Sequence, residues 1–365
     1  MLSSVYSTWM AQLLTGPLPD ETKATCDDCA MLPRSGTAKD AVFFHPVTKC
    51  CTFQPNLTNY RAGLILSDDD SELAVGRRTV EHRLRTRIGV TPWGMEANES
   101  FKLLYKNARA AFGRASALGC QHQIAGRCGI WHHRPATCAT WFCKYARGAT
   151  GSEFWQSLNK LLNHVDLQLG FWCALEMGID SGVLARLLEP KKLDAAELGA
   201  VFPEDSYRRL WGRWMGREAE YYRGCAERIL PLAWADVVQI CGADVAILSR
   251  LVRERHEKLL SESLPERPRL GLVQIQGAES GKYRAVTYSE YDPVLLSSAL
   301  VAVLPHFDGR PAEEVLEEIR LQRGIRLNPA LVRRMADFRV LVEDDAASPS
   351  ACPAAQDPGL PTAGK

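Results

Sequence analysis

The feature that most constrains this 365-residue chain is a concentration of cysteine toward its N-terminal end. Eight of the twelve cysteines precede residue 144, namely Cys26, Cys29, Cys50, Cys51, Cys120, Cys128, Cys138 and Cys143. The stretch that holds them is rich in Gly, Pro and Asn and has little of the apolar periodicity of core helices or strands. So many thiols in a loop-rich segment favour a metal-binding region over a hydrophobic core.

Composition and the first residues favour a cytoplasmic globular protein. Hydrophobic residues make up 46% of the chain, charged residues 24%, and the formal net charge is +1, so we expect no membrane and no nucleic-acid partner. The N-terminus lacks the basic segment and apolar stretch of a signal peptide, and no apolar run approaches the ~20 residues of a membrane span. In a reducing compartment, dense cysteine indicates metal binding or catalysis rather than disulfides.

The spacing of the first four thiols is compatible with metal ligation. Cys26 and Cys29 form a C-x2-C pair, which can grip one ion from a tight turn. Cys50 and Cys51 are adjacent, and such a pair is better suited to ligation than to a strained disulfide between neighbours. Thiolates are soft donors, so the metal expected here is zinc or iron, including an iron–sulfur cluster such as [4Fe–4S].

The last two thiols require a bend in the chain if both are ligands. Cys138 and Cys143 are five residues apart, which on a continuous helix would point them about 140° away from each other. We expect Arg134–Pro135 to fix the turn that delivers Cys138. Aromatic side chains nearby are expected to exclude water from the thiols, and they are Trp131, Trp141 and Phe142.

The cysteine pattern resembles a known family. The segments "CDDC", "KCCTF" and "GCQHQIAGRCGIWHHRPATCATWFCK" are similar to the YkgJ-like zinc- or iron-chelating cysteine-cluster domains. The positions that match the family's C-terminal motif are Cys120, Cys128, Ile130, Trp131, Arg134, Pro135, Cys138 and Cys143. The resemblance covers about residues 23–147 and implies metal chelation; the family includes a flagellin lysine N-methylase. Twenty residues separate Cys29 from Cys50, far more than in the family's usual motif, so the pairing of the N-terminal four thiols stays open.

Histidines and arginines near the thiols have other expected roles. His132 and His133 are interpreted as neighbours of the site rather than as ligands, because thiols are abundant. The five arginines between Gly76 and Arg87 could form a phosphate-binding patch, but few aromatic residues interleave with them. A solvated helix face is the expected structure there.

The expected fold is mainly α, in five parts. Residues 1–22 form an N-terminal helix and linker, 23–150 a loop-rich cysteine-cluster metal-binding domain, 151–265 a helical domain, 266–343 a small α+β winged-helix-like domain, and 344–365 a disordered tail. Helical periodicity in the third part predicts that Cys173, Cys225 and Cys241 are packing residues. Cys352 falls in the Pro- and Ala-rich tail.

The C-terminal part resembles PqqD-like winged-helix modules. Two alternating stretches, "LGLVQIQ" and "YRAVTY", predict a hairpin, and helical segments around "FDGRPAEEVLEEI" and a terminal strand follow. Three helical segments are expected, the first over 291–307. The resemblance implies that a peptide could add as a strand along an exposed hairpin edge.

The sequence is compatible with three functions. The first is a cytoplasmic cysteine-cluster protein that binds zinc or an iron–sulfur centre. The second is a metal-dependent enzyme that modifies a peptide or protein, as the lysine N-methylase resemblance implies, although no Gly-rich loop for a methyl donor is evident. The third is a metal or redox sensor.

Overall fold

The fold of the chain is mainly helical. A computed structural model describes residues 2–33, 43–189, 203–277 and 281–343, with 55% helix and 9% strand. The expected mainly α class is therefore confirmed. The expected tail, including Cys352, lies outside the described residues. No helix in the described ranges is both long and apolar enough to cross a bilayer.

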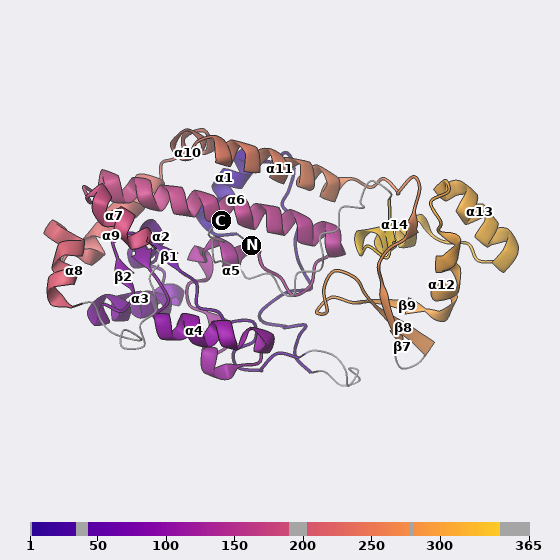
Figure 1. Ribbon diagram of the computed structural model, residues 1–365, viewed down its shortest axis with the longest axis horizontal. Coiled ribbons are helices and arrows are strands. Elements are labelled where there is room, and N and C mark those ends of the chain that lie inside the picture. The colour runs from indigo at the N-terminus through magenta and orange to yellow at the C-terminus, as the bar shows by residue number, and fades with distance from the viewer. Residues whose placement is uncertain (1, 34–42, 190–202, 278–280, 344–365) are drawn as a thin grey trace.

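A long helix, α6 (Gly148–Glu176), organises the main body (Figure 1). Its apolar stripe is the one that the sequence predicts, and residues such as Phe154, Leu158 and Val165 on it are fully buried. Other helices of the body are α1 (Ser4–Leu13), α2 (Asn59–Ser67), α9 (Glu218–Ile229), α10 (Trp234–Cys241) and α11 (Ala243–Leu260). Helices α10 and α11 contact α6, and α2 packs tightly on α9.

Two helical stretches of the sequence are interrupted at glycines. Residues 204–229 divide into α8 (Glu204–Trp211), a 3-10 turn and α9, with Gly212 at φ +51°. Residues 234–260 divide into α10 and α11 at Gly242, with φ +79°. Only glycine adopts such backbone angles without strain, and each break lets the chain change direction.

The cysteine-bearing region shares its core with the helical body. Buried residues from both sides of position 150, such as Leu57, Ile130, Leu161 and Val252, belong to one hydrophobic cluster. Cys173 and Cys225 are fully buried in this cluster and Cys241 packs against it, which confirms that these three thiols are packing residues. Helix α7 (Ser181–Leu188) lies at the end of the body, after α6.

Besides α2, short strands and further helices lie between α1 and α6. The strands are β1 (Leu57–Thr58), β2 (Val90–Thr91), β3 (Gly94–Met95), β4 (Gln123–Ile124) and β5 (Arg127–Cys128). The helices are α3 (Ala74–Thr86), α4 (Glu99–Asn107) and α5 (Ala136–Thr140). Strands β1, β3 and β2 form one small antiparallel sheet, and β4 and β5 form a hairpin. Thus most of this region is loop, as its Gly and Pro content predicts.

A separate module with its own core forms the C-terminal end (Figure 1). Its strands β7 (Gln274–Gly277), β8 (Lys282–Val286) and β9 (Val294–Ser297) form an antiparallel sheet in that order. Its helices are α12 (Ser298–Val303), α13 (Ala312–Arg323) and α14 (Pro329–Asp337). Strand β10 (Leu341–Val342) returns to pair with β6 (Arg269–Leu270).

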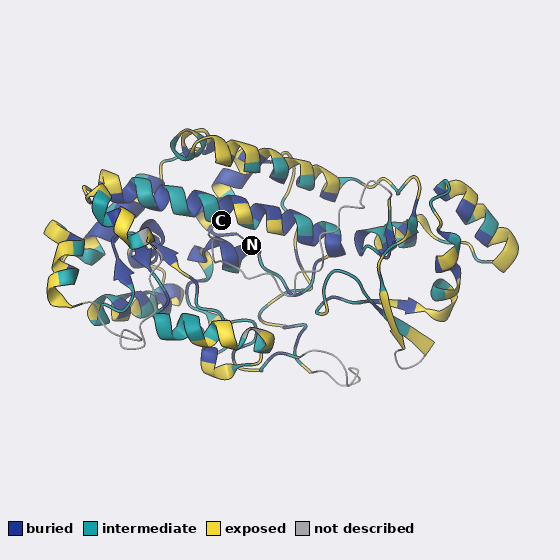
Figure 2. Ribbon diagram, viewed as in Figure 1, coloured by how far each residue is buried: buried dark blue, intermediate teal, exposed yellow. Residues whose placement is uncertain are grey.

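The prediction of one helix in this module is wrong for the first part of its segment. The segment 291–307 was expected to be helical throughout, but Val294–Ser297 is strand β9. Its side chains alternate buried and exposed, which is the period of a strand. The expected hairpin is confirmed as β7 and β8, with Gln274 opposite Val286. Figure 2 shows that much of the outer surface of this module is exposed.

Candidate metal centre

A tight hairpin holds Cys120 and Cys128 near each other. Strands β4 and β5 are joined by Ala125 and Gly126, which have φ of +48° and +78°. Positive φ at both central residues is the geometry of a two-residue hairpin turn. The amide of Gly129 donates to the carbonyl of His122 at 2.8 Å, which continues the pairing beyond the strands.

The bend that the Cys138–Cys143 spacing demands is present. The amide of Cys138 donates to the carbonyl of Pro135 at 3.0 Å, in the first turn of α5. This helix ends at Thr140, and Trp141 is extended with φ −94° and ψ 130°. Cys138 and Cys143 therefore do not lie on one continuous helix.

The chain around Cys50 and Cys51 lies between the hairpin and the N-terminal C-x2-C pair. The amide of Cys120 donates to the carbonyl of Cys51 at 2.7 Å. The ammonium group of Lys49 donates to the carbonyl of Cys26 and, at 3.3 Å, to that of Gly126. Three segments far apart in the sequence thus meet at one place.

Four thiols form a first group through their electrostatic interactions: Cys51, Cys120, Cys128 and Cys138. The pKa of Cys120 is raised to about 12 and that of Cys128 to about 11, mainly by burial and in part by repulsion from the Cys51 sulfur. Burial also raises the pKa of Cys138, with added repulsion from the other three sulfurs. Mutual effects of this kind require neighbouring sulfur atoms.

The remaining thiols form a second group: Cys26, Cys29, Cys50 and Cys143. Cys29 and Cys143 belong to a small hydrophobic cluster with Met31 and Phe44, against which Cys50 packs. Burial raises the pKa of Cys143 to about 12, with repulsion from Cys29. Burial also raises the pKa of Cys26, with repulsion from Cys51 and Cys29.

A hydrogen bond between adjacent thiols joins the two groups. It raises the pKa of Cys50 and lowers that of Cys51, so Cys50 is the donor and Cys51 the acceptor. All eight thiols that the sequence singles out are thus connected through neighbouring sulfurs. The buried Cys173 and Cys225 instead interact with each other in the main core.

Thiolate sulfur is a suitable ligand for a soft cation, although the sulfurs are not arranged around a single ion position. Every cysteine in the described ranges is a free thiol. Backbone amides of His122 and Gln123 donate to the Cys120 sulfur, and that of Ile130 donates to Cys128, which favours their thiolate forms. Within the described ranges, however, no three Cys, His, Asp or Glu side chains are already placed to hold a metal ion.

Few positive charges of the protein face this cluster. The Arg134 guanidinium lies 3.5 Å from the centre of the Trp131 ring and donates to the carbonyl of Cys138 at 3.3 Å. Its charge opposes the rise in pKa of Cys26, Cys128 and Cys138. Among the described residues, Arg134, Lys49 and Lys144 are the cations that act on these sulfurs, and three positive charges do not balance eight thiolates. Ionisation of the whole set therefore requires a further cation.

Two nearby imidazoles, those of His133 and His122, have hydrogen-bond partners outside the thiol set, although Nδ1 of His133 has none among the described residues. Nε2 of His133 lies 2.6 Å from a carboxylate oxygen of Asp68. His122 is fully buried, with Nδ1 2.6 Å from the hydroxyl of Thr79, and burial lowers its pKa to about 3. A neutral, hydrogen-bonded His122 orients the hairpin and is not part of the thiol set.

Sequence reasoning missed a close contact that seats the hairpin. Gly76 in α3 lies against the backbone of Gly129, and a Cβ atom at Gly76 would be 1.8 Å from the Gly129 carbonyl oxygen. The sequence feature that indicates such a contact is a glycine within a helical stretch, because a glycine there often has a packing reason. On the same helix Arg78 and Arg85 are exposed as expected, but Arg83 is buried.

We expect Gly76→Ala to lower the free energy of unfolding by about 1–3 kcal/mol, because a rigid carbonyl must move. Chemical denaturation followed by tryptophan fluorescence measures this. Gly224→Ala on α9 is the control, since its new Cβ would meet only the flexible end of Met177. Equal stabilities of the two variants would contradict the contact.

Sequence reasoning also missed a buried ion pair between Arg61 and Asp166, next to the turn that leads to Cys138. Asp166 on α6 accepts from Arg61 at 3.0 and 3.1 Å and from the hydroxyls of Tyr6 and Tyr60 at 2.6 and 2.5 Å. Nη1 of Arg61 donates to the Arg134 carbonyl at 3.2 Å. This pair therefore ties α1, α2 and α6 to the turn that delivers Cys138.

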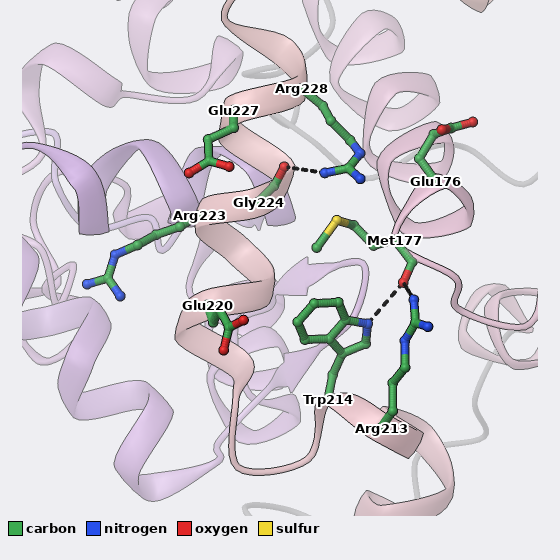
Figure 3. A pocket seen from close by; sticks show the side chains of 9 residues that line it. All are labelled: Glu176, Met177, Arg213, Trp214, Glu220, Arg223, Gly224, Glu227 and Arg228. Carbon is green, nitrogen blue, oxygen red and sulfur yellow. Dashed lines mark hydrogen bonds between the residues drawn. The ribbon is translucent and has the colours of Figure 1, made fainter.

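A cleft lies between the end of α6 and helix α9 (Figure 3). Its volume is about 480 Å³, and Trp214, Met177, three glutamates and three arginines line it. The indole of Trp214 and the guanidinium of Arg213 both donate to the Met177 carbonyl, at 3.0 and 2.9 Å. Its charges are balanced and no cysteine lines it, so it does not extend the metal centre.

Comparison with known proteins gives no relative. No family model, no curated protein and no solved structure matches this chain.

Proposed function

We propose that this chain is a cysteine-cluster protein that binds zinc or an iron–sulfur cluster through its N-terminal thiols. The proposed ligands come from Cys26, Cys29, Cys50, Cys51, Cys120, Cys128, Cys138 and Cys143. One observation carries the proposal: these thiols, spread over more than a hundred residues, meet in one half-buried network. Buried thiols that repel each other on ionisation are stabilised by a bound cation.

Two sets of four thiolates are the arrangement we favour. The Cys51 sulfur repels those of Cys120, Cys128 and Cys138, whereas Cys143 interacts with Cys29 and Cys50. Cys26 and the Cys50–Cys51 pair connect the two sets. Four thiolates complete a structural zinc site or hold one iron–sulfur cluster. The YkgJ-like resemblance is consistent with this assignment and is part of the proposal.

Anaerobic purification followed by metal analysis and an absorption spectrum tests the proposal. We expect tightly bound metal in the full chain. Stoichiometric zinc in a colourless solution indicates structural sites, and a broad visible band indicates an iron–sulfur cluster. A folded, metal-free protein with eight thiols that react with Ellman's reagent and do not take up zinc or iron would refute it.

A second candidate, a metal-dependent enzyme that modifies a peptide, is favoured by one observation at the C-terminal module. All four residues of β7 are exposed, and among the described strands β7 pairs only with β8. A peptide could pair with its free edge. The module also contacts the segment after Cys143, because Lys144 donates to the Tyr291 carbonyl at 2.7 Å and the Tyr145 amide to Asp292 at 3.0 Å.

Peptide-array binding to the full chain tests this second function. Ile275→Pro in β7 removes a backbone donor and should abolish binding if the edge is used. Leu321→Ala, on an exposed face of α13, is the control that should leave binding unchanged. Unaltered binding by the Ile275 variant would exclude strand addition at β7.

A further inference from the structure

A small pocket beside the thiol region has a lining of unusual chemistry. Its volume is about 130 Å³, well below that of sites for drug-sized ligands. The residues around it are Gln54, His82, Arg83, Thr86, Ile88, Asn98 and Gln121. Five of these seven carry side-chain N–H donors, and none carries a carboxylate.

Arg83 is the buried member of this lining. It is 3% exposed, and two of its nitrogens donate to the carbonyls of Ile88 and Glu96. Its third nitrogen, Nη1, is buried and has no hydrogen-bond partner among the described residues. A buried guanidinium with an unused N–H group is costly unless an acceptor reaches it.

The charge of Arg83 is also poorly compensated by the protein. Within the described ranges Arg83 forms no ion pair, and the nearest carboxylate to influence it, that of Glu96, is bonded to Lys102 at 2.9 Å. Burial lowers the pKa of Arg83 to about 10, so it still carries its positive charge at neutral pH. Arg83 lies in the last turn of α3, where a cation also complements the helix dipole.

We propose that this pocket binds a small oxyanion, phosphate or the carboxylate of a small molecule, with Arg83 as its charged anchor. Amide groups of Gln54, Asn98 and Gln121 line the pocket. Asn98 uses its oxygen to cap α4, which leaves its amide donors for a ligand, whereas the Gln121 amide nitrogen also lies 3.3 Å from Nε2 of His122. Gln121 follows Cys120 directly, so the bound anion lies next to the proposed metal centre. The proposal does not depend on that centre being occupied.

Isothermal titration calorimetry of the full chain with inorganic phosphate, and separately with acetate, tests the proposal at constant ionic strength in chloride. We expect saturable binding of one anion, and the tighter of the two identifies its class. Arg83→Gln should weaken that binding about ten-fold or more, which is at least 1.4 kcal/mol. Arg85→Gln, which removes an exposed charge from the same helix, should change it by less than about two-fold.

A variant that spares Arg83 guards against a folding defect. Gln54→Leu removes a donor from the pocket without touching the carbonyl contacts of Arg83, and it should weaken anion binding several-fold. Binding of neither anion above the chloride background would overturn the proposal. So would equal weakening by Arg85→Gln and Arg83→Gln, or unchanged affinity in both the Arg83 and Gln54 variants, because Arg83 would then serve only to hold the end of α3.

Discussion

Cys138→Ser should release metal from the full chain and make the region around residues 26–143 sensitive to protease. Cys138 is half-buried and its sulfur interacts with those of Cys51, Cys120 and Cys128. Serine is a poor ligand for a soft metal, and the free energy of metal binding is coupled to folding. Metal analysis after gel filtration and limited trypsin digestion measure both effects.

Cys225→Ala is the matched control for this variant. It also removes a buried thiol, but one in the main core, and should cost about 1 kcal/mol while leaving metal content unchanged. His132→Ala should retain metal as well, since we assign no imidazole ligand. If the Cys138 variant kept full metal and full protease resistance, Cys138 would be a packing residue and the metal would be held by the second group, Cys26, Cys29, Cys50 and Cys143.

Asp166→Asn should destabilise the protein by about 3–5 kcal/mol, the largest effect on stability that we expect from a conservative change. The substitution keeps the shape of the side chain but leaves the fully buried Arg61 guanidinium without a counter-charge. It also puts an amide nitrogen in place of the oxygen that accepts from one of the two tyrosine hydroxyls, Tyr6 or Tyr60. Urea denaturation of the two proteins gives the difference directly.

Glu204→Gln provides the comparison with an exposed ion pair. Glu204 pairs with Arg87 at 2.8 Å on the surface, so its loss should cost less than about 1 kcal/mol. Because Arg61 also holds the Arg134 carbonyl, Asp166→Asn should further lower metal content, whereas Glu204→Gln should not. A stability change in Asp166→Asn no larger than that in Glu204→Gln would contradict the role of the buried pair.

The sequence predicts which thiols belong together because soft ligands are uncommon and their spacing is informative. It separates eight clustered cysteines from Cys173, Cys225 and Cys241, whose helical periodicity places them in the core. It also predicts the bend after Cys138, since a helix cannot point two positions five apart in one direction. Both predictions depend only on the spacing of residues that lie near each other in the sequence.

Features that depend on contacts between distant segments could not be predicted in the same way. The Gly76–Gly129 approach and the Arg61–Asp166 pair join residues 53 and 105 positions apart, and nothing local marks them as partners. Arg83 looked like part of a solvated helix face because its neighbours Arg78 and Arg85 are solvated. Strand β9 was missed because its four residues are also good helix-face residues, and only pairing with β8 decides their conformation.

Metal K-edge X-ray absorption on the anaerobically purified full chain tests the central claim most directly, because it identifies the atoms bound to the metal. For zinc, we predict a first shell of sulfur alone at about 2.3 Å, from four thiolates. For iron, we predict sulfur neighbours together with a short iron–iron distance of a cluster. A first shell made of nitrogen or oxygen at about 2.0–2.1 Å would contradict ligation by the cysteine cluster.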